Sequence, residues 1–92
     1  MSIEVRIPPL LRRYTDGAKS VQVDGGNVAV LLDKLDEQHP GIKAQLFTED
    51  GTLHRFVNIY LNDEDIRFLD NLNTELADGD VVSILPAVAG GC

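Results

Sequence analysis

Residues 20–41, which read SVQVDGGNVAVLLDKLDEQHPG, decide the fold of this chain. The first five of them alternate polar and apolar side chains, the pattern of a half-buried strand. Gly25-Gly26 interrupts that strand, and Asn27 offers a side chain suited to cap the first turn of a helix. The next apolar residues recur at helical spacing and therefore share one helix face: Val28, Leu31, Leu32 and Leu35. Pro40-Gly41 ends the predicted helix.

A second alternating segment precedes this stretch. Residues 3–7 read IEVRI and predict a strand that Pro8-Pro9 closes. Residues 10–17 form a connection that ends in an Asp-Gly turn signal. The two strands and the connection suggest a hairpin, and residues 42–47 after the helix suggest one further helical turn.

The second half of the chain predicts the rest of a sheet. Residues 56–61 form the most strand-like run, and residues 66–68 predict a short edge strand. Residues 81–85 predict a last strand, which Pro86 stops because proline lacks the N–H that a ladder needs. This order predicts an α+β roll of the β-grasp kind over residues 1–86, with a mixed sheet of four to five strands covered by one main helix. The side chains expected to point at the helix are Ile3, Val5, Ile7, Val21, Val23, Val57, Ile59, Val82 and Ile84.

Length and composition restrict the classes of protein that this chain can be. Its 92 residues allow one domain, and a hydrophobic fraction of 43% is enough for a core. The single cysteine excludes an intrachain disulfide framework and a multi-cysteine zinc site. No run approaches the ~20 apolar residues of a membrane span, and no signal segment opens the chain, so we expect a cytoplasmic protein.

The charges are unevenly distributed. Eight Lys and Arg stand against fifteen Asp and Glu, which gives a net charge of −7 and argues against a general nucleic-acid binder. Residues 1–45 hold six acids and six bases, whereas residues 46–92 hold nine acids and two bases. Solvated turns explain the acidic groups around Asp63 and Asp78. The alternative is that one acidic face docks on a basic partner.

The sequence shows no arrangement of residues typical of an enzyme active site. His39 and His54 lack metal-ligand spacing, and Gly25-Gly26 lacks the pattern of a phosphate-binding loop. The carboxylates of residues 63–65 are consecutive and diverge on a turn. Cys92 has no base in position to activate it. We therefore predict no catalytic residue, no metal and no cofactor bound by the chain itself.

Two other features point to partner proteins. If Val57, Ile59 and Leu61 face the helix, alternation places apolar side chains on the opposite face of the sheet: Phe56, Tyr60, Val81 and Leu85. This face is either a docking surface or is covered by loops.

The second feature is the end of the chain, a short tail of small, uncharged residues: Ala87, Val88, Ala89, Gly90, Gly91 and Cys92. Six residues reach about 20 Å, and two glycines let a backbone thread a narrow channel. A disordered end explains the flexibility of such a tail but not its size and neutrality. We therefore predict a tail that enters the active sites of other proteins.

A β-grasp domain of this size ending in Gly90-Gly91 resembles the ubiquitin-like sulfur carrier proteins of the MoaD/ThiS family. The resemblance is carried by residues 55–68 (RFVNIYLNDEDIRF), residues 84–91 (ILPAVAGG) and residues 7–12 (IPPLLR). The resemblance covers nearly the whole chain. Within the family, the sequence looks most like the carriers that serve cysteine biosynthesis.

The resemblance implies a mechanism in which partner enzymes supply the catalysis. An E1-like enzyme uses ATP to adenylate the carboxylate of Gly91, and a sulfur donor converts it to a thiocarboxylate. A pyridoxal-phosphate cysteine synthase then takes the sulfur, and a zinc-dependent JAMM-type peptidase releases cysteine from the carrier. The resemblance thus implies ATP, pyridoxal phosphate and zinc on the partners, and no nucleic-acid or membrane partner.

Cys92 departs from this pattern because Gly91 then lacks a free carboxylate. Cys92 is either encoded and trimmed before use, or the cargo of a carrier–cysteine adduct, or an appended residue. Three other functions stay open: a MoaD-like small subunit of molybdopterin synthase, a ubiquitin-like protein modifier and a thiol redox protein acting through Cys92.

Overall fold

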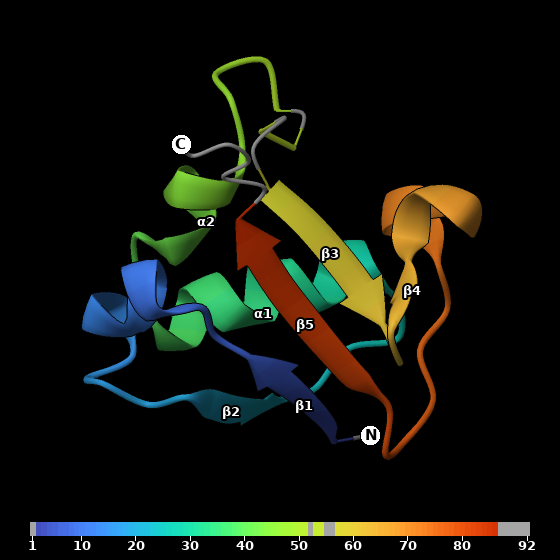
Figure 1. Cartoon of the computed structure of the whole chain (residues 1–92), viewed down its shortest axis with the longest axis horizontal. Helices are drawn as coiled ribbons and strands as arrows, with labels where there is room; N and C mark the ends of the chain where they lie inside the picture. The colour runs from blue at the N-terminus through green and yellow to red at the C-terminus, as the bar shows by residue number, and fades with distance from the viewer. Residues whose placement is uncertain (1, 52, 55–56, 87–92) are drawn as a thin grey trace.

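The computed structural model describes residues 2–51, 53–54 and 57–86, and it forms a five-stranded sheet with helices on one face (Figure 1). The elements in chain order are β1 (Ile3–Arg6), the 3₁₀ helix η1 (Pro9–Tyr14), β2 (Ser20–Val23), α1 (Val28–Gln38), α2 (Ile42–Leu46), β3 (Val57–Leu61), β4 (Glu64–Asp65), the 3₁₀ helices η2 (Ile66–Phe68) and η3 (Asn71–Asn73), and β5 (Val81–Pro86). This is the α+β architecture that the apolar pattern predicts.

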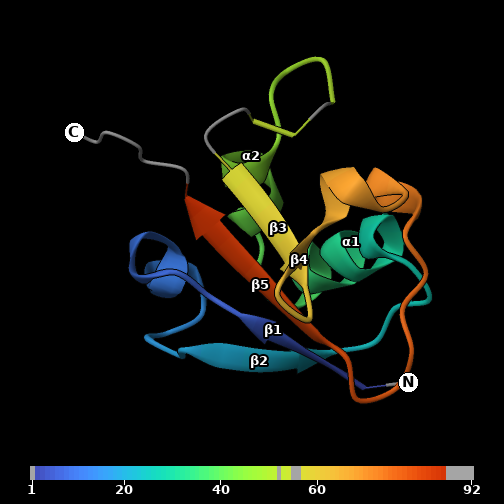
Figure 2. The ribbon, with the colours of Figure 1, turned by 45° about the vertical axis from the view of Figure 1, so that its right-hand side comes forward.

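The two strands that are farthest apart in sequence lie side by side in the middle of the sheet. The strand order is β2-β1-β5-β3-β4, and Figure 2 shows β5 between β1 and β3. β1 and β5 are parallel, with Val5 opposite Val82, whereas the other neighbours are antiparallel. On the other side of β5, Ile59 of β3 lies opposite Ile84. The strand that leads to the end of the chain is therefore central and is paired on both sides.

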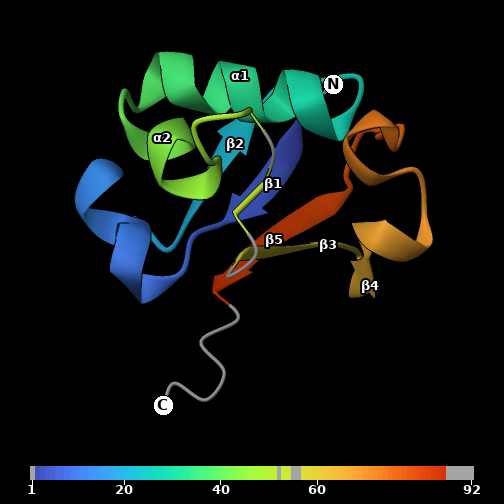
Figure 3. The ribbon, with the colours of Figure 1, turned by 90° about the horizontal axis from the view of Figure 1, so that it is seen from above.

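Helix α1 covers one face of this sheet, and α2 lies on the same side (Figure 3). The N-cap prediction is confirmed, because the Asn27 side chain accepts a hydrogen bond from the Val30 N–H at 2.8 Å. The buried core joins the helix face to the inward side chains of the strands: Ile3, Val5, Ile7, Val23, Val28, Leu31, Leu32, Leu35, Ile42, Leu46, Ile59, Ile66, Leu76, Val82 and Ile84. Val21 and Val57, also predicted to face the helix, are half-buried and pack against this core.

The backbone at Gly25 approaches α1 so closely that only glycine fits at this position. A Cβ atom at this position would lie 2.8 Å from the Leu31 Cα, closer than nonbonded carbons approach in proteins. At Gly26 the corresponding space is open. The first glycine therefore serves packing between the end of β2 and the helix, which agrees with the structural rather than phosphate-binding interpretation of the pair.

The prediction of an edge strand at residues 66–68 is wrong. Asn62 and Asp63 both have positive φ angles, of 51° and 73°, and form a two-residue turn that brings Glu64 opposite Leu61. The edge strand is therefore β4, and the chain then leaves the sheet as η2, whose first turn the Asp65 side chain caps.

Two smaller expectations also change. The connection over residues 10–17 contains η1, which follows directly on Pro8. β5 runs through Pro86, which lies opposite Val57, instead of stopping before it. The pairing of β5 with β1 ends at Ser83, so Pro86 lies beyond it and is paired with β3 alone. Proline, which has no N–H to donate, is tolerated at such a position.

Candidate functional site: the open face of the sheet

The whole predicted tail lies outside the described residues. This applies to Ala87, Val88, Ala89, Gly90, Gly91 and Cys92, and also to Phe56 on the predicted docking face. The division into a domain over residues 1–86 and a tail over residues 87–92 stays a prediction. What the structure describes is the central strand that leads to the tail and the surface around its end.

The sheet has one open face, and alternation along β5 separates it from the core. Val82 and Ile84 are buried beneath α1, whereas Leu85 points the other way and is 46% exposed. Paired residues of neighbouring strands share a face, so Tyr60 and Arg6, both opposite Ser83, lie on the open face too. The sequence therefore placed Tyr60 and Leu85 correctly on one surface.

A groove of about 640 Å³ lies over this open face. Tyr60 and Leu85 line it together with three cationic side chains from the N-terminal part of the chain: Arg6, Arg12 and Lys19. Val81 does not line the groove; it is half-buried at the start of β5, opposite Glu4. The predicted docking face is thus a mixed surface, where Tyr60 and Leu85 lie beside three cations and two carboxylates, Glu4 and Asp63.

The sequence did not predict that two large apolar side chains, Leu10 and Phe68, would be exposed. Leu10 on η1 is 66% exposed, and it lines a second, smaller hollow of about 210 Å³ with Pro8 and Val57. Phe68 on η2 is 80% exposed. Both lie on short 3₁₀ helices, where neither the strand period nor the α-helix period applies, so the sequence carried no signal for their exposure.

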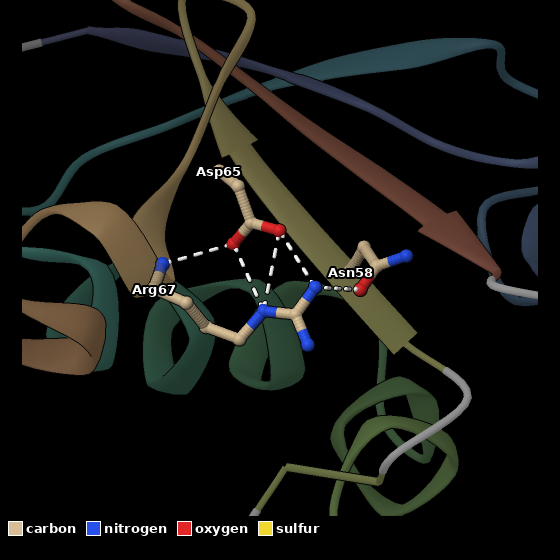
Figure 4. A network of polar contacts seen from close by, with 3 residues as sticks. All are labelled: Asn58, Asp65 and Arg67. Carbon is tan, nitrogen blue, oxygen red and sulfur yellow. Dashed lines mark hydrogen bonds and ion pairs between the residues drawn. The ribbon is translucent and has the colours of Figure 1, made fainter.

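An ion pair fixes the β4 edge of the sheet (Figure 4). The Asp65 carboxylate is 8% exposed and accepts hydrogen bonds from the side chain and the main-chain N–H of Arg67. Arg67 also donates from Nη2 to Asn58 Oδ1 at 2.9 Å. The hydrogen bonds from Arg67 hold the pKa of Asp65 below its ordinary value of 3.8, and the carboxylate holds the pKa of Arg67 above its usual range.

Two further acidic residues of the second half, Asp78 and Asp80, lie in the turn that precedes β5. Asp80 accepts from the Asn62 side chain at 3.1 Å and from the Ala77 N–H at 2.8 Å, and Asp78 accepts from the Ser2 N–H at 2.8 Å. Asp63 and Glu64 are exposed while Asp65 is buried, so the three consecutive carboxylates do diverge. The carboxylates of Asp78 and Asp80 thus serve turns, and docking of this acidic end on a basic partner stays a prediction.

The described part of the chain holds no group of three His, Cys, Asp or Glu side chains arranged to bind a metal ion. His39 ends α1, where its N–H bonds to the Leu35 carbonyl, and the His54 N–H bonds to the Leu46 carbonyl after α2. Among the described residues, no helix is both long and apolar enough to span a bilayer.

Comparison with known proteins identifies close relatives. The model of the ThiS family matches residues 5–91. The sulfur carrier protein CysO of Mycobacterium tuberculosis is 50% identical over 93 aligned residues, which cover 99% of this chain and all of that protein. Small archaeal modifier protein 3 of Haloferax volcanii is 35% identical over a similar span, 99% of this chain and all of that protein.

Solved structures show the same relatives. The crystal structure of M. tuberculosis CysO superposes with a TM-score of 0.89 at 48% identity, covering 94% of this chain and 99% of that one. CysO in the Amycolatopsis orientalis BexX/CysO complex superposes equally well at 50% identity, with 97% and 99% covered. The predicted β-grasp fold is confirmed by these matches.

Proposed function

This chain belongs to the ThiS family, and we propose that it is a sulfur carrier protein of the CysO kind, which carries sulfur as a thiocarboxylate on Gly91 for cysteine biosynthesis. The observation that supports the proposal most directly is the 50% identity to CysO over the full length of both proteins. A carrier is a substrate of its partner enzymes rather than a catalyst.

The chemistry resides at the end of the chain because a carboxylate is a poor electrophile. We propose that an oxygen of the Gly91 carboxylate attacks the α-phosphorus of ATP on an E1-like enzyme, and that pyrophosphate leaves. A sulfur nucleophile then attacks the Gly91 carbonyl carbon and displaces AMP, which leaves the thiocarboxylate. Small, uncharged residues before Gly91 suit passage through the channels of such enzymes.

Later steps are proposed on the same family basis. A pyridoxal-phosphate cysteine synthase would join the sulfur to an activated serine derivative. An S-to-N acyl shift through a five-membered ring would then leave cysteine bound to Gly91 by an amide. A zinc-dependent JAMM-type peptidase would release that cysteine. If Cys92 is encoded or is this adduct, the same peptidase step would free Gly91 for loading, and an appended residue is the third alternative.

Intact mass measurement tests the proposal. The form that ends at Gly91 is incubated with the E1-like enzyme, ATP and a sulfur source, beside the full chain as the matched control. Exchange of oxygen for sulfur should add about 16 Da to the shorter form and nothing to the full chain. A gain by the full chain, or no gain by the shorter form, would contradict the mechanism.

The comparisons favour two further candidates. Since small archaeal modifier protein 3 is 35% identical, a ubiquitin-like modifier joined through Gly91 to lysine side chains is the second proposal. Isopeptide-linked carrier in cell extract would support it. A putative molybdopterin converting factor subunit of Pyrococcus furiosus also shares the fold at 25% identity and a TM-score of 0.72. A stable complex with a large catalytic subunit and sulfur transfer to a pterin precursor would favour that MoaD-like role instead.

A further inference from the structure

The groove on the open face carries opposite charges at its two ends. Glu4 lies opposite Val81, where β5 begins, and Asp63 follows Asn62, whose N–H bonds to the Val81 carbonyl at 2.8 Å. Both carboxylates line the groove, and that of Glu4 accepts a hydrogen bond from Arg6 Nε at 3.2 Å. The acidic end of the groove is therefore the end farthest along β5 from the tail.

The cations gather at the end where β5 terminates. The Ile7 carbonyl accepts from Arg12 Nε at 3.1 Å, and the Ile7 N–H bonds to the Lys19 carbonyl at 2.8 Å. Since Arg6 lies opposite Ser83 and β1 runs parallel to β5, Ile7 and the residues bound to it lie toward Leu85. Figures 1 and 2 show η1, which carries Arg12, beside this end of β5.

These cations are available to a partner. Lys19 is exposed and Arg12 is half-buried. Within the part of the chain that the structure describes, the ion pairs engage Arg6, Lys43 and Arg67 but neither Arg12 nor Lys19. Arg13 and Lys34 form no ion pair among the described residues either, but of these four cations only Arg12 and Lys19 line the groove.

We propose that the Arg12–Lys19 end of the groove docks on an enzyme surface that presents Asp and Glu side chains around the opening that receives the tail. The inference rests on the proposed function and specifies the chemistry of the partner. Attraction at this end brings the last strand to the opening. A reversed approach would set the Asp63 carboxylate and the Glu4–Arg6 ion pair, instead of Arg12 and Lys19, against the same carboxylates, so the distribution of charge also favours one orientation of the carrier.

Charge reversal at two exposed lysines tests this inference. Lys19→Glu changes the groove, and Lys34→Glu makes the same change on α1, on the other side of the sheet. Each substitution takes the net charge from −7 to −9. The dissociation constant for the E1-like enzyme is measured by titration calorimetry for both variants and the unaltered form ending at Gly91, at about 0.05 and 0.5 M salt.

We expect Lys19→Glu to weaken binding about tenfold at low salt, Lys34→Glu to weaken it less than twofold, and the difference to shrink at high salt. Arg12→Glu should act in the same direction as Lys19→Glu. The inference would be overturned if Lys19→Glu and Lys34→Glu changed the dissociation constant equally, or if the effect of Lys19→Glu were the same at both salt concentrations. Failure of the unaltered form to bind the enzyme would also overturn it. Binding with the expected pattern but without a sulfur mass gain would instead contradict the proposed function alone.

Discussion

Asp65 and Arg67 are two residues apart and are joined by four hydrogen bonds. The two shortest run from Arg67 Nη2 to Asp65 Oδ2 at 2.7 Å and from the Arg67 main-chain N–H to Asp65 Oδ1 at 2.9 Å. The carboxylate is buried beneath an arginine side chain that remains 63% exposed. One pair therefore closes the two-residue strand β4, caps η2 and reaches across to Asn58 of β3.

Because of this ion pair, we expect the free energy of unfolding to decrease as the pH falls into the acid range. The folded-state pKa of Asp65 lies below its ordinary value of 3.8, so the ionised carboxylate stabilises the fold above that pH, and this contribution is lost as the pH falls through the folded-state pKa. We expect Asp65→Asn to lower the urea midpoint near neutral pH and to flatten its decline below about pH 4. Asp63→Asn, in the exposed turn, is the control and should leave the profile unchanged. Parallel profiles for Asp65→Asn and the unaltered chain would contradict the role of this pair.

The two adjacent glycines should respond differently to the same substitution. Gly25→Ala sets a Cβ 2.8 Å from the Leu31 Cα, a backbone atom that cannot swing away. Overpacking of this kind costs about 1–3 kcal/mol, a large part of the stability of a small domain. Gly26→Ala meets no atom within 4 Å and should be nearly neutral. Urea unfolding of the two variants checks the difference, and equal midpoints would refute the packing role of Gly25.

The helix could be predicted because its causes are local. Asn27 caps the first turn, and the apolar residues of α1 repeat at helical spacing within eight positions. The edge strand was misplaced because residues 66–68 are apolar enough for a strand, whereas two consecutive residues at positive φ end β3 and close the hairpin earlier. After glycine, Asn and Asp are the residues that adopt positive φ most readily, so Asn62-Asp63 carries a weak local signal for this two-residue turn.

The site was predictable only in part, for a similar reason. Alternation within one strand placed Tyr60, and alternation within another placed Leu85. The cations of the groove come from β1, from η1 and from the residue just before β2, so no local period relates them. They lie beside Leu85 and Tyr60 only because β1 pairs in parallel with β5, a strand more than seventy residues later.

Truncation of the open apolar side chains should weaken partner binding without unfolding the domain. Leu85→Ala removes a side chain that is 46% exposed on the groove, and Val30→Ala removes one that is 40% exposed on α1, so the pair is matched in exposure. We expect Leu85→Ala and Tyr60→Ala to raise the dissociation constant for the E1-like enzyme about tenfold, as residues near an interface centre do. Val30→Ala should have no effect. Unchanged binding by Tyr60→Ala with an intact circular dichroism spectrum would refute the docking role of this face.

The length of the tail should matter to within one residue. If Gly91 is the adenylated residue, a form that ends at Gly90 presents its carboxylate about 3.5 Å short of the reacting phosphorus. Misplacement of a reacting group by even 1 Å costs about a hundredfold in rate, so we expect sulfur loading of this form to fall at least that far. The form ending at Gly91 should load fully, and in the full chain Cys92→Ser should still need removal of residue 92 before loading. If Cys92→Ser abolishes function and the form ending at Gly91 cannot restore it, the thiol of Cys92 acts itself and the carrier mechanism fails.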